Sequence, residues 1–120
     1  MLKNIFSKVY LIIVMIKMTK NLEEVIVVEW EESERDWGTR PDGCSLHLTI
    51  EDSKQYVKEY WDRMPDEVPD EYSRPIGEPY KEKVDEKLYE QVAKSKQGIR
   101  LWHGKMREYN LNGKYWVNMK

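Results

Sequence analysis

The sequence is poor in the residues that mark disulfide-bonded and metal-binding proteins. It contains a single cysteine, Cys44, and two histidines, His47 and His103. One cysteine cannot form an intrachain disulfide, and this usage favours a cytoplasmic setting. Cys44 and His47 lie three residues apart on a predicted strand, so their side chains face opposite sides and do not share a metal. We therefore expect neither a metal site nor a cofactor.

Catalytic signatures are also missing. The sequence has no phosphate-binding loop, no Gly-x-Gly-x-x-Gly pattern and no zinc ribbon. Neither Cys44 nor Ser45 belongs to a recognisable nucleophile–base motif. The acidic pairs at 66–67 and 70–71 are typical of a solvated loop. These absences predict a binding protein and not an enzyme, with no catalytic residues.

Neither sign of charge is in large excess. The 120 residues include 20 basic and 22 acidic side chains, for a net charge of −2. Proteins that bind nucleic-acid polymers usually have a basic surplus or stripe, so a nucleic-acid polymer is not an expected partner. A local group of arginines can still bind a small anion, because net charge does not describe local arrangement.

No hydrophobic run is long enough to span a membrane. The longest, 9–16, is continuously apolar, but a membrane-spanning helix needs roughly 20 such residues. Residues 16–18 offer no small-residue cleavage site for a signal peptide. We interpret residues 1–17 as an N-terminal apolar extension from an upstream start codon, with the working protein beginning at Met18. A short membrane-associating segment is the alternative interpretation.

The order of predicted elements indicates one α+β domain over residues 18–120, a small antiparallel sheet with two helices. Strands are predicted at 24–31, 44–49, 80–84 and 99–102. Thr49 and Asp52 have capping-box spacing and begin the first helix, which stops at Pro65. Asp85 caps the second helix, which ends at Gly98. The turn at 112–113 predicts a hairpin between 108–111 and 114–117.

Three further predictions concern packing. Alternation in the second strand places Cys44, Leu46 and Leu48 on one face and Ser45, His47 and Thr49 on the other. The spacing of Val57, Tyr60, Trp61 and Met64 predicts a buried helical stripe. The connection 64–80 contains four prolines and predicts a long ordered lid, because irregular loops above about 12 residues are often functional.

The most informative segment is 37–43, which reads Trp-Gly-Thr-Arg-Pro-Asp-Gly. Glycine admits positive φ and proline fixes φ near −65°, so the segment predicts a loop of fixed shape. Arg40 offers a planar fork that suits phosphates, and Trp37 offers a flat face on which a base can stack. The simpler interpretation is an ordinary rigid loop with a packed Trp and an exposed Arg, and both interpretations remain open.

Arginines and aromatic residues recur at the predicted loops and strand ends. Guanidinium groups that fork onto phosphates and rings that stack on bases together suit a nucleotide ligand. The candidate ligand-binding residues are Trp37, Arg40, Asp42, His47, Tyr72, Arg74, Arg100 and Arg107, and Trp102 and His103 belong to the same set of groups that suit an anion or a base. Each arginine taken alone is better explained by surface solvation, so the hypothesis depends on their concentration.

Several motifs resemble the phage Thoeris anti-defence 1 proteins. They are Trp37-Gly-Thr-Arg-Pro-Asp-Gly-Cys-Ser-Leu-His-Leu-Thr49, Tyr60-Trp61, Met64-Pro65-Asp66, Asp70-Glu-Tyr72 and Gly77-Glu-Pro79-Tyr80, within residues 25–101. The resemblance implies non-enzymatic sequestration of a cyclic ADP-ribose isomer made by a bacterial TIR-domain defence protein. Held in the cytoplasm of the infected host, the signal would not reach its effector.

The resemblance also implies pockets at a subunit interface with arginines on the pyrophosphate. Arg40 is the residue that the loop motif assigns to this role, and Arg100 and Arg107 are both candidates for a second, C-terminal arginine. We expect a homodimer or a larger even oligomer, because five Trp and eight Tyr are more than a small core needs. The alternative is an inhibitor or adaptor of a phage or mobile element that binds a protein through its aromatic, acidic loop. No membrane partner is expected.

Overall fold

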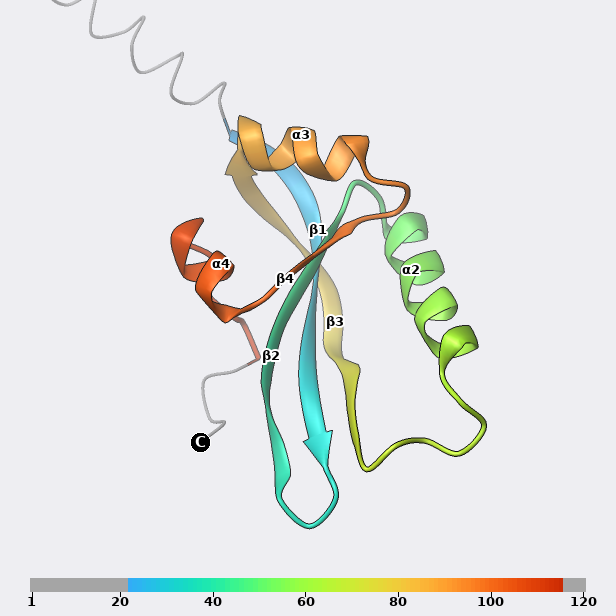
Figure 1. The fold of residues 1–120 in the computed structure, drawn as a ribbon. Helices are drawn as coiled ribbons and strands as arrows, with labels where there is room; N and C mark the ends of the chain where they lie inside the picture. The colour runs from blue at the N-terminus through green and yellow to red at the C-terminus, as the bar shows by residue number, and fades with distance from the viewer. Residues whose placement is uncertain (1–21, 116–120) are drawn as a thin grey trace, which may run out of the picture.

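The computed structural model describes residues 22–115, which form one four-stranded antiparallel sheet and three helices (Figure 1). The strands are β1 (Leu22–Glu34), β2 (Gly38–His47), β3 (Glu71–Asp85) and β4 (Ile99–Leu101), in the spatial order β3-β1-β2-β4. The helices are α2 (Ile50–Arg63), α3 (Glu86–Lys94) and α4 (His103–Glu108). The predicted small α+β fold is confirmed, and α4 is a helix beyond the two predicted. The proposed extension 1–17 and the start at Met18 lie outside the described residues.

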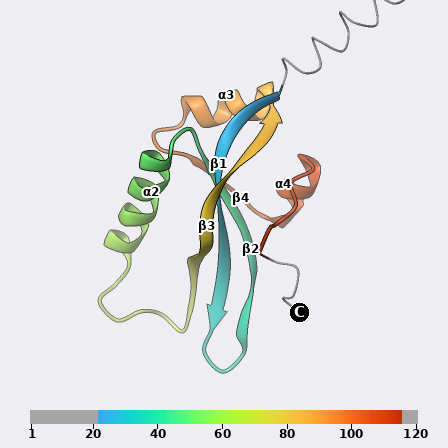
Figure 2. The ribbon, with the colours of Figure 1, turned by 180° about the vertical axis from the view of Figure 1, so that it is seen from behind.

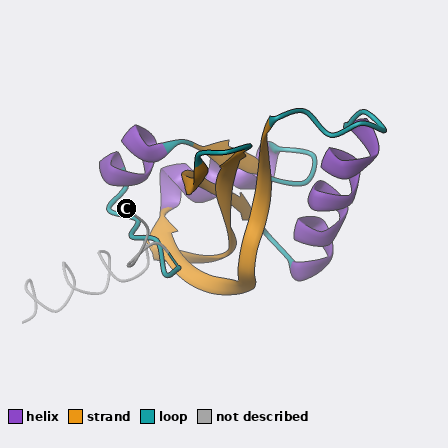
Figure 3. Cartoon of the chain, turned by 90° about the horizontal axis from the view of Figure 1, so that it is seen from below, coloured by secondary structure: helices purple, strands orange, loops and turns teal. Residues whose placement is uncertain are grey.

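Different helices cover the two faces of the sheet, with α2 on one side and α4 on the other (Figure 3). The apolar core lies on the face covered by α3 and α4. It comprises Val25, Val27, Cys44, Leu46, Val84, Leu88, Val92, Leu101, Met106 and Leu111. Cys44 and Leu46 are fully buried there and Leu48 packs against them, so the predicted alternation of β2 is confirmed. Burial of each large aliphatic side chain stabilises the fold by about 1.5–3 kcal/mol.

Side-chain caps fix where α2 and α3 begin, as predicted. The backbone N–H of Asp52 donates to Thr49 Oγ1 over 3.0 Å, and that of Leu88 donates to Asp85 Oδ1 over 2.7 Å. The predicted end of α3 at Gly98 is wrong, because Ser95 is already extended and its N–H caps the helix. None of the helices within residues 22–115 is both long and apolar enough to cross a membrane.

The predicted loop 37–43 and the predicted lid 64–80 are mostly strand. β2 begins at Gly38 and pairs with β1, so only the turn 35–37 is irregular. β3 begins at Glu71 and continues through Pro75 and Pro79. Proline is tolerated because β3 is an edge strand that pairs only with β1 among the described strands. The connection that remains between α2 and β3 is 64–70.

The predicted buried stripe of α2 is only partly confirmed. Val57 and Tyr60 are half-buried, whereas Trp61 is 39% exposed, and Ser53 is the fully buried residue of the helix. The helix therefore does not seal the face of the sheet beneath it. That incomplete contact leaves room for a pocket.

The predicted C-terminal hairpin is wrong in its first arm. Within the predicted first arm, 108–111, residue 108 ends α4 and residues 109–110 form a turn, and the second arm extends beyond the described residues. The buried carboxylate of Glu29 determines the path of this segment instead. It accepts the backbone N–H of Lys114 over 2.7 Å and that of Tyr115 over 3.1 Å, which holds the C-terminal segment on the sheet.

Candidate functional site

A pocket of about 290 Å³ lies between α2 and the face of the sheet opposite the core. It is lined by Trp30 of β1, Tyr56 and Tyr60 of α2, Ser73 of β3, Arg100 of β4, and Trp102, which follows β4. Four of these side chains are aromatic and one is cationic. The volume is near the lower end of the range for small-molecule sites.

Arg100 is held at the centre of the pocket between two indole rings. Its guanidinium carbon lies 4.5 Å from the ring centroid of Trp30 and 4.5 Å from that of Trp102. Nη2 donates to the backbone oxygen of Asp42 over 2.5 Å and to its Oδ2 over 3.1 Å. Nη1 is buried and has no hydrogen-bond partner among the described residues. A buried donor left unpaired costs about 1–3 kcal/mol, and more when the group is charged.

The charges of the pocket are nearly balanced. Burial lowers the pKa of Arg100, while the carboxylate of Asp42 opposes that change. The guanidinium stays charged, because an arginine loses its proton only far above neutral pH. Asp42 also accepts the hydroxyl of Ser73, and the Tyr60 hydroxyl donates to the Ser73 backbone oxygen over 2.5 Å. Asp42 thus accepts from both Ser73 and Arg100, while Nη1 of Arg100 stays unpaired within the described residues.

A hydrogen-bonded chain under the pocket positions Trp30. Its Nε1 donates to Ser45 Oγ over 2.8 Å, and the same oxygen lies 2.8 Å from His47 Nε2. His47 Nδ1 lies 2.7 Å from the carbonyl oxygen of Gln97, which can only accept. Nδ1 therefore carries the proton and Nε2 accepts the Ser45 hydroxyl. Burial lowers the pKa of His47, so the ring is neutral. Both side chains are fully buried, so this Ser–His pair orients the indole and does not meet a substrate.

The structure brings some of the predicted ligand-binding residues together. Asp42 and Arg100 meet at the pocket, and the ring of His47 lies below it, 5.0 Å from that of Tyr56. Tyr72 and Arg74 flank Ser73 in β3 but do not line the pocket, and Arg74 Nε donates to Glu31 over 2.6 Å. Of the two candidates for the C-terminal arginine, the pocket contains Arg100.

The other predicted residues do not line the pocket. Arg40 follows the same face of β2 as Asp42, but it bridges Glu32 and Glu34 at 2.9 and 3.0 Å. Trp37 lies in the β1–β2 turn and is 85% exposed. Arg107 is exposed on α4, which covers the opposite face. The residues 37–40 therefore form a separate surface, and the loop motif does not build the pocket.

Sequence reasoning did not name Trp30, Tyr56, Tyr60 or Ser73 as site residues. The strand pattern gives Trp30 no role; in the structure it lies where the register between β1 and β2 shifts, between Glu29 and Glu31, and it lines the pocket. Tyr56 and Tyr60 are four residues apart on α2, and this spacing alone predicts two aromatic rings on one helix face. Ser73 carries no signal, because its role depends on the unpredicted first half of β3.

Carboxylates also gather near Arg40. Ligand oxygens of Glu32, Glu34 and Glu71 all lie within 4.8 Å of one another, as a metal site would require. Arg40 already forms ion pairs with two of the three. The group is therefore better explained as an ion-pair network than as a metal site.

Comparison of the chain with protein-family models, with curated proteins and with solved structures found no match. We therefore base the functional proposal on the geometry of the pocket and on the resemblance of the sequence motifs. The geometric support comes from Arg100 and its aromatic neighbours.

Proposed function

We propose that this chain is a non-catalytic binding protein that sequesters a nucleotide of the cyclic ADP-ribose type in the pocket around Arg100. The proposal rests on Arg100 Nη1, a charged donor buried among aromatic rings without a partner in the described residues. A phosphate oxygen would supply a charge-assisted hydrogen bond to this atom. The neighbouring rings offer flat faces to a base, and such stacking contributes about 1–3 kcal/mol.

The ligand would enter beside Trp102, which is 55% exposed and covers one face of the guanidinium. Displacement of this indole would uncover Nη1 and allow the ring to stack on the base. A pocket of about 290 Å³ holds part of a dinucleotide-sized ligand, so the remainder would lie outside the opening. A second copy of the chain would cover that remainder, in a homodimer or a larger even oligomer.

Sequestration fits the polar groups better than catalysis does. Within the described lining, the hydroxyls of Tyr60 and Ser73 donate to protein acceptors, and Asp42 beside the pocket accepts from Ser73 and Arg100. These bonds hold the pocket in a fixed shape, which suits binding. A signal held intact in the cytoplasm of an infected bacterium would not activate a TIR-dependent effector, which is the role that the family resemblance implies.

Calorimetric titration with cyclic ADP-ribose and its isomers tests the proposal. We expect a heat of binding for at least one isomer, followed by recovery of the unchanged molecule when the complex is heated and the supernatant is analysed by mass spectrometry. Recovery of an altered nucleotide would mean that the protein is an enzyme. Absence of heat with every isomer would reject the proposal and favour the protein-binding alternative.

Two arginine variants locate the site. Arg100→Lys keeps the charge but loses the fork, and Arg100→Gln loses the charge. Removing a charged partner of a buried phosphate typically costs about 2–5 kcal/mol, so we expect affinity to fall by about 30-fold to several thousand-fold. Arg40→Ala is the matched control, because Arg40 is 65% exposed and already balanced by two carboxylates. If Arg40→Ala loses binding while Arg100→Gln retains it, the ligand binds at the hairpin instead.

A further inference from the structure

The turn of the β1–β2 hairpin presents an exposed indole. Trp37 is 85% exposed, more than any other large hydrophobic side chain in the described part of the chain. The turn has a defined shape, because the Trp37 N–H donates to the Glu34 oxygen over 3.1 Å and Asp36 and Gly38 have φ of 72° and 87°. The hairpin extends beyond the helices in both opposite views (Figures 1 and 2). An indole held in solvent on a fixed turn is a common anchor of protein interfaces.

The α2–β3 loop lies against this turn and enlarges the surface. The Arg35 N–H donates to the backbone oxygen of Asp70 over 3.0 Å, and the side chains of Arg35 and Asp70 form an ion pair at 3.0 Å. A hollow of about 270 Å³ lies between the hairpin and the loop, and its apolar lining is Val68, Pro69 and Tyr72. Val68 is itself 41% exposed. The turn and the loop thus form one surface with an exposed ring and a shallow apolar hollow.

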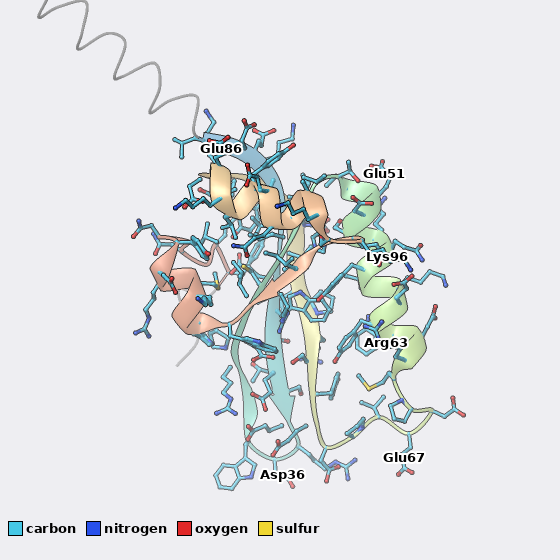
Figure 4. The ribbon with its side chains drawn as sticks, turned by 45° about the horizontal axis from the view of Figure 1, so that its top comes forward. Asp36, Glu51, Arg63, Glu67, Glu86 and Lys96 are labelled. Carbon is cyan, nitrogen blue, oxygen red and sulfur yellow. The ribbon has the colours of Figure 1, made fainter. Side chains whose placement is uncertain are left out.

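This surface is strongly acidic, and we call residues 31–40 and 66–74 the acidic end. They contain eight acidic and three basic residues, a net charge of −5. The whole described chain, 22–115, has 22 acidic and 15 basic residues, so most of its net charge of −7 lies here. Asp36 and Glu67 both point outward at this end (Figure 4). Ion pairs within the acidic end already engage Glu31, Glu32, Glu34 and Asp70. Three basic residues supply these pairs, so a net charge of −5 remains for an opposite charge on a partner to offset.

We propose that the acidic end is a docking surface for a protein with an apolar slot rimmed by lysine or arginine. The slot would take the Trp37 indole, and the basic rim would face the excess carboxylates. Nucleic acids and anionic membrane surfaces would be repelled. A small cation would neutralise the carboxylates but would leave the indole in water. The proposal is independent of the nucleotide pocket, because Trp37 does not line it.

Selection of short random peptides on the full-length protein provides a probe of defined chemistry. We expect enriched peptides that combine lysine or arginine with large apolar residues, and affinity that falls with added salt. Binding of the synthetic peptides is then measured by fluorescence anisotropy. Trp37→Ala should weaken it by about 30-fold or more, the range of an interface anchor. Asp36→Asn should weaken it by several-fold and reduce its salt dependence, because asparagine keeps the positive φ of the turn while the charge is removed.

Leu22→Ala is the matched control, since Leu22 is an exposed apolar residue (48%) at the opposite end of β1. It should change peptide affinity by less than about two-fold. The proposal is overturned if no peptide is enriched, if the enriched peptides are acidic or uncharged, or if they bind the Trp37→Ala variant equally well. It is also overturned if Trp37→Ala dissociates an oligomer of the chain alone in light scattering, because the acidic end would then be an interface between copies. Circular dichroism should show that Trp37→Ala unfolds within about 2 °C of the parent, as expected for an exposed side chain.

Discussion

Gly43 determines how closely β4 can approach β2. Its φ is +81°, and a Cβ placed on it would overlap the carbonyl oxygen of Leu101 and lie 3.0 Å from the carbonyl carbon. These are backbone atoms, so they cannot turn aside as the end of a long side chain can. The paired register of the two strands begins at the next residue, Cys44. Gly43→Ala should therefore push the strands apart and draw Arg100 away from Asp42.

The expected loss in the free energy of unfolding has two causes. A left-handed backbone costs a residue with a Cβ about 1–2 kcal/mol. Separation of the strands weakens the charged hydrogen bonds between Arg100 and Asp42, which are worth about 1.5–3 kcal/mol each. Together they predict a loss of about 3–5 kcal/mol in the free energy of unfolding. For a domain of this size, 1 kcal/mol shifts Tm by about 4–8 °C, so Tm should fall by about 12 °C or more in scanning calorimetry.

Two other glycines serve as controls. Gly38 has φ of +87°, but nothing lies within 4 Å of the position that a Cβ would occupy, so Gly38→Ala should cost only the backbone term of about 1–2 kcal/mol. Gly104 in α4 has open space and no positive φ, so Gly104→Ala should be neutral or stabilise by up to about 1 kcal/mol. If Gly43→Ala costs no more than Gly38→Ala, the close approach of Leu101 does not limit packing and the reasoning is refuted.

Three further outcomes can be checked by simple measurements. Because burial lowers the pKa of His47 below the value of the unfolded chain, 6.5, the unfolded state takes up the proton first. The free energy of unfolding should therefore fall by up to about 1.4 kcal/mol per pH unit as the pH drops below 6.5. In urea titrations at several pH values, His47→Gln should remove this contribution to the pH dependence of the unfolding free energy. Burial also raises the pKa of the Cys44 thiol to about 12, so a thiol reagent should modify the folded protein at least about 100-fold more slowly than the urea-unfolded chain. Thr49→Ala removes the acceptor of the Asp52 N–H and should cost about 1 kcal/mol in urea unfolding, whereas Thr49→Ser should not.

The parts of the fold that could be predicted from the sequence are those fixed by neighbours in the chain. The caps at Thr49 and Asp85 bond to residues three positions away, and their side chains alone identify them. The alternation around Cys44 is equally local, since it reports only which face of a strand is apolar. Caps and alternation of this kind depend only on residues within the element, so the sequence shows them whatever the tertiary structure.

The errors concern features that distant residues decide. Pro75 and Pro79 are typical of a loop, and they become strand only because β1 pairs with one side of β3. The turn signal at 112–113 is outweighed by α4 and by a buried carboxylate more than 80 residues earlier. A local sequence pattern does not show that β1 pairs with β3 or that Glu29 bonds to the C-terminal segment.

The candidate site shows the same division. Asp42 and Arg100 stand among the predicted ligand-binding candidates on residue type alone, but they are 58 residues apart, and nothing in the sequence pairs them. The choice between Arg100 and Arg107 depends on which face each element covers, which only the topology of the sheet decides. Trp30 becomes a pocket residue through its contact with Arg100, and no spacing in the sequence indicates that pair.

The carboxylate of Glu29 has a consequence for how the protein is made. Its backbone partners in Lys114 and Tyr115 are 85 and 86 residues further along the chain, so translation produces them long after β1. An ionised carboxylate buried without partners is strongly unfavourable, and the centre of the sheet cannot close around Glu29 until those residues are free of the ribosome. The nascent chain should therefore stay sensitive to proteases until residues 114 and 115 have left the ribosome and can reach Glu29.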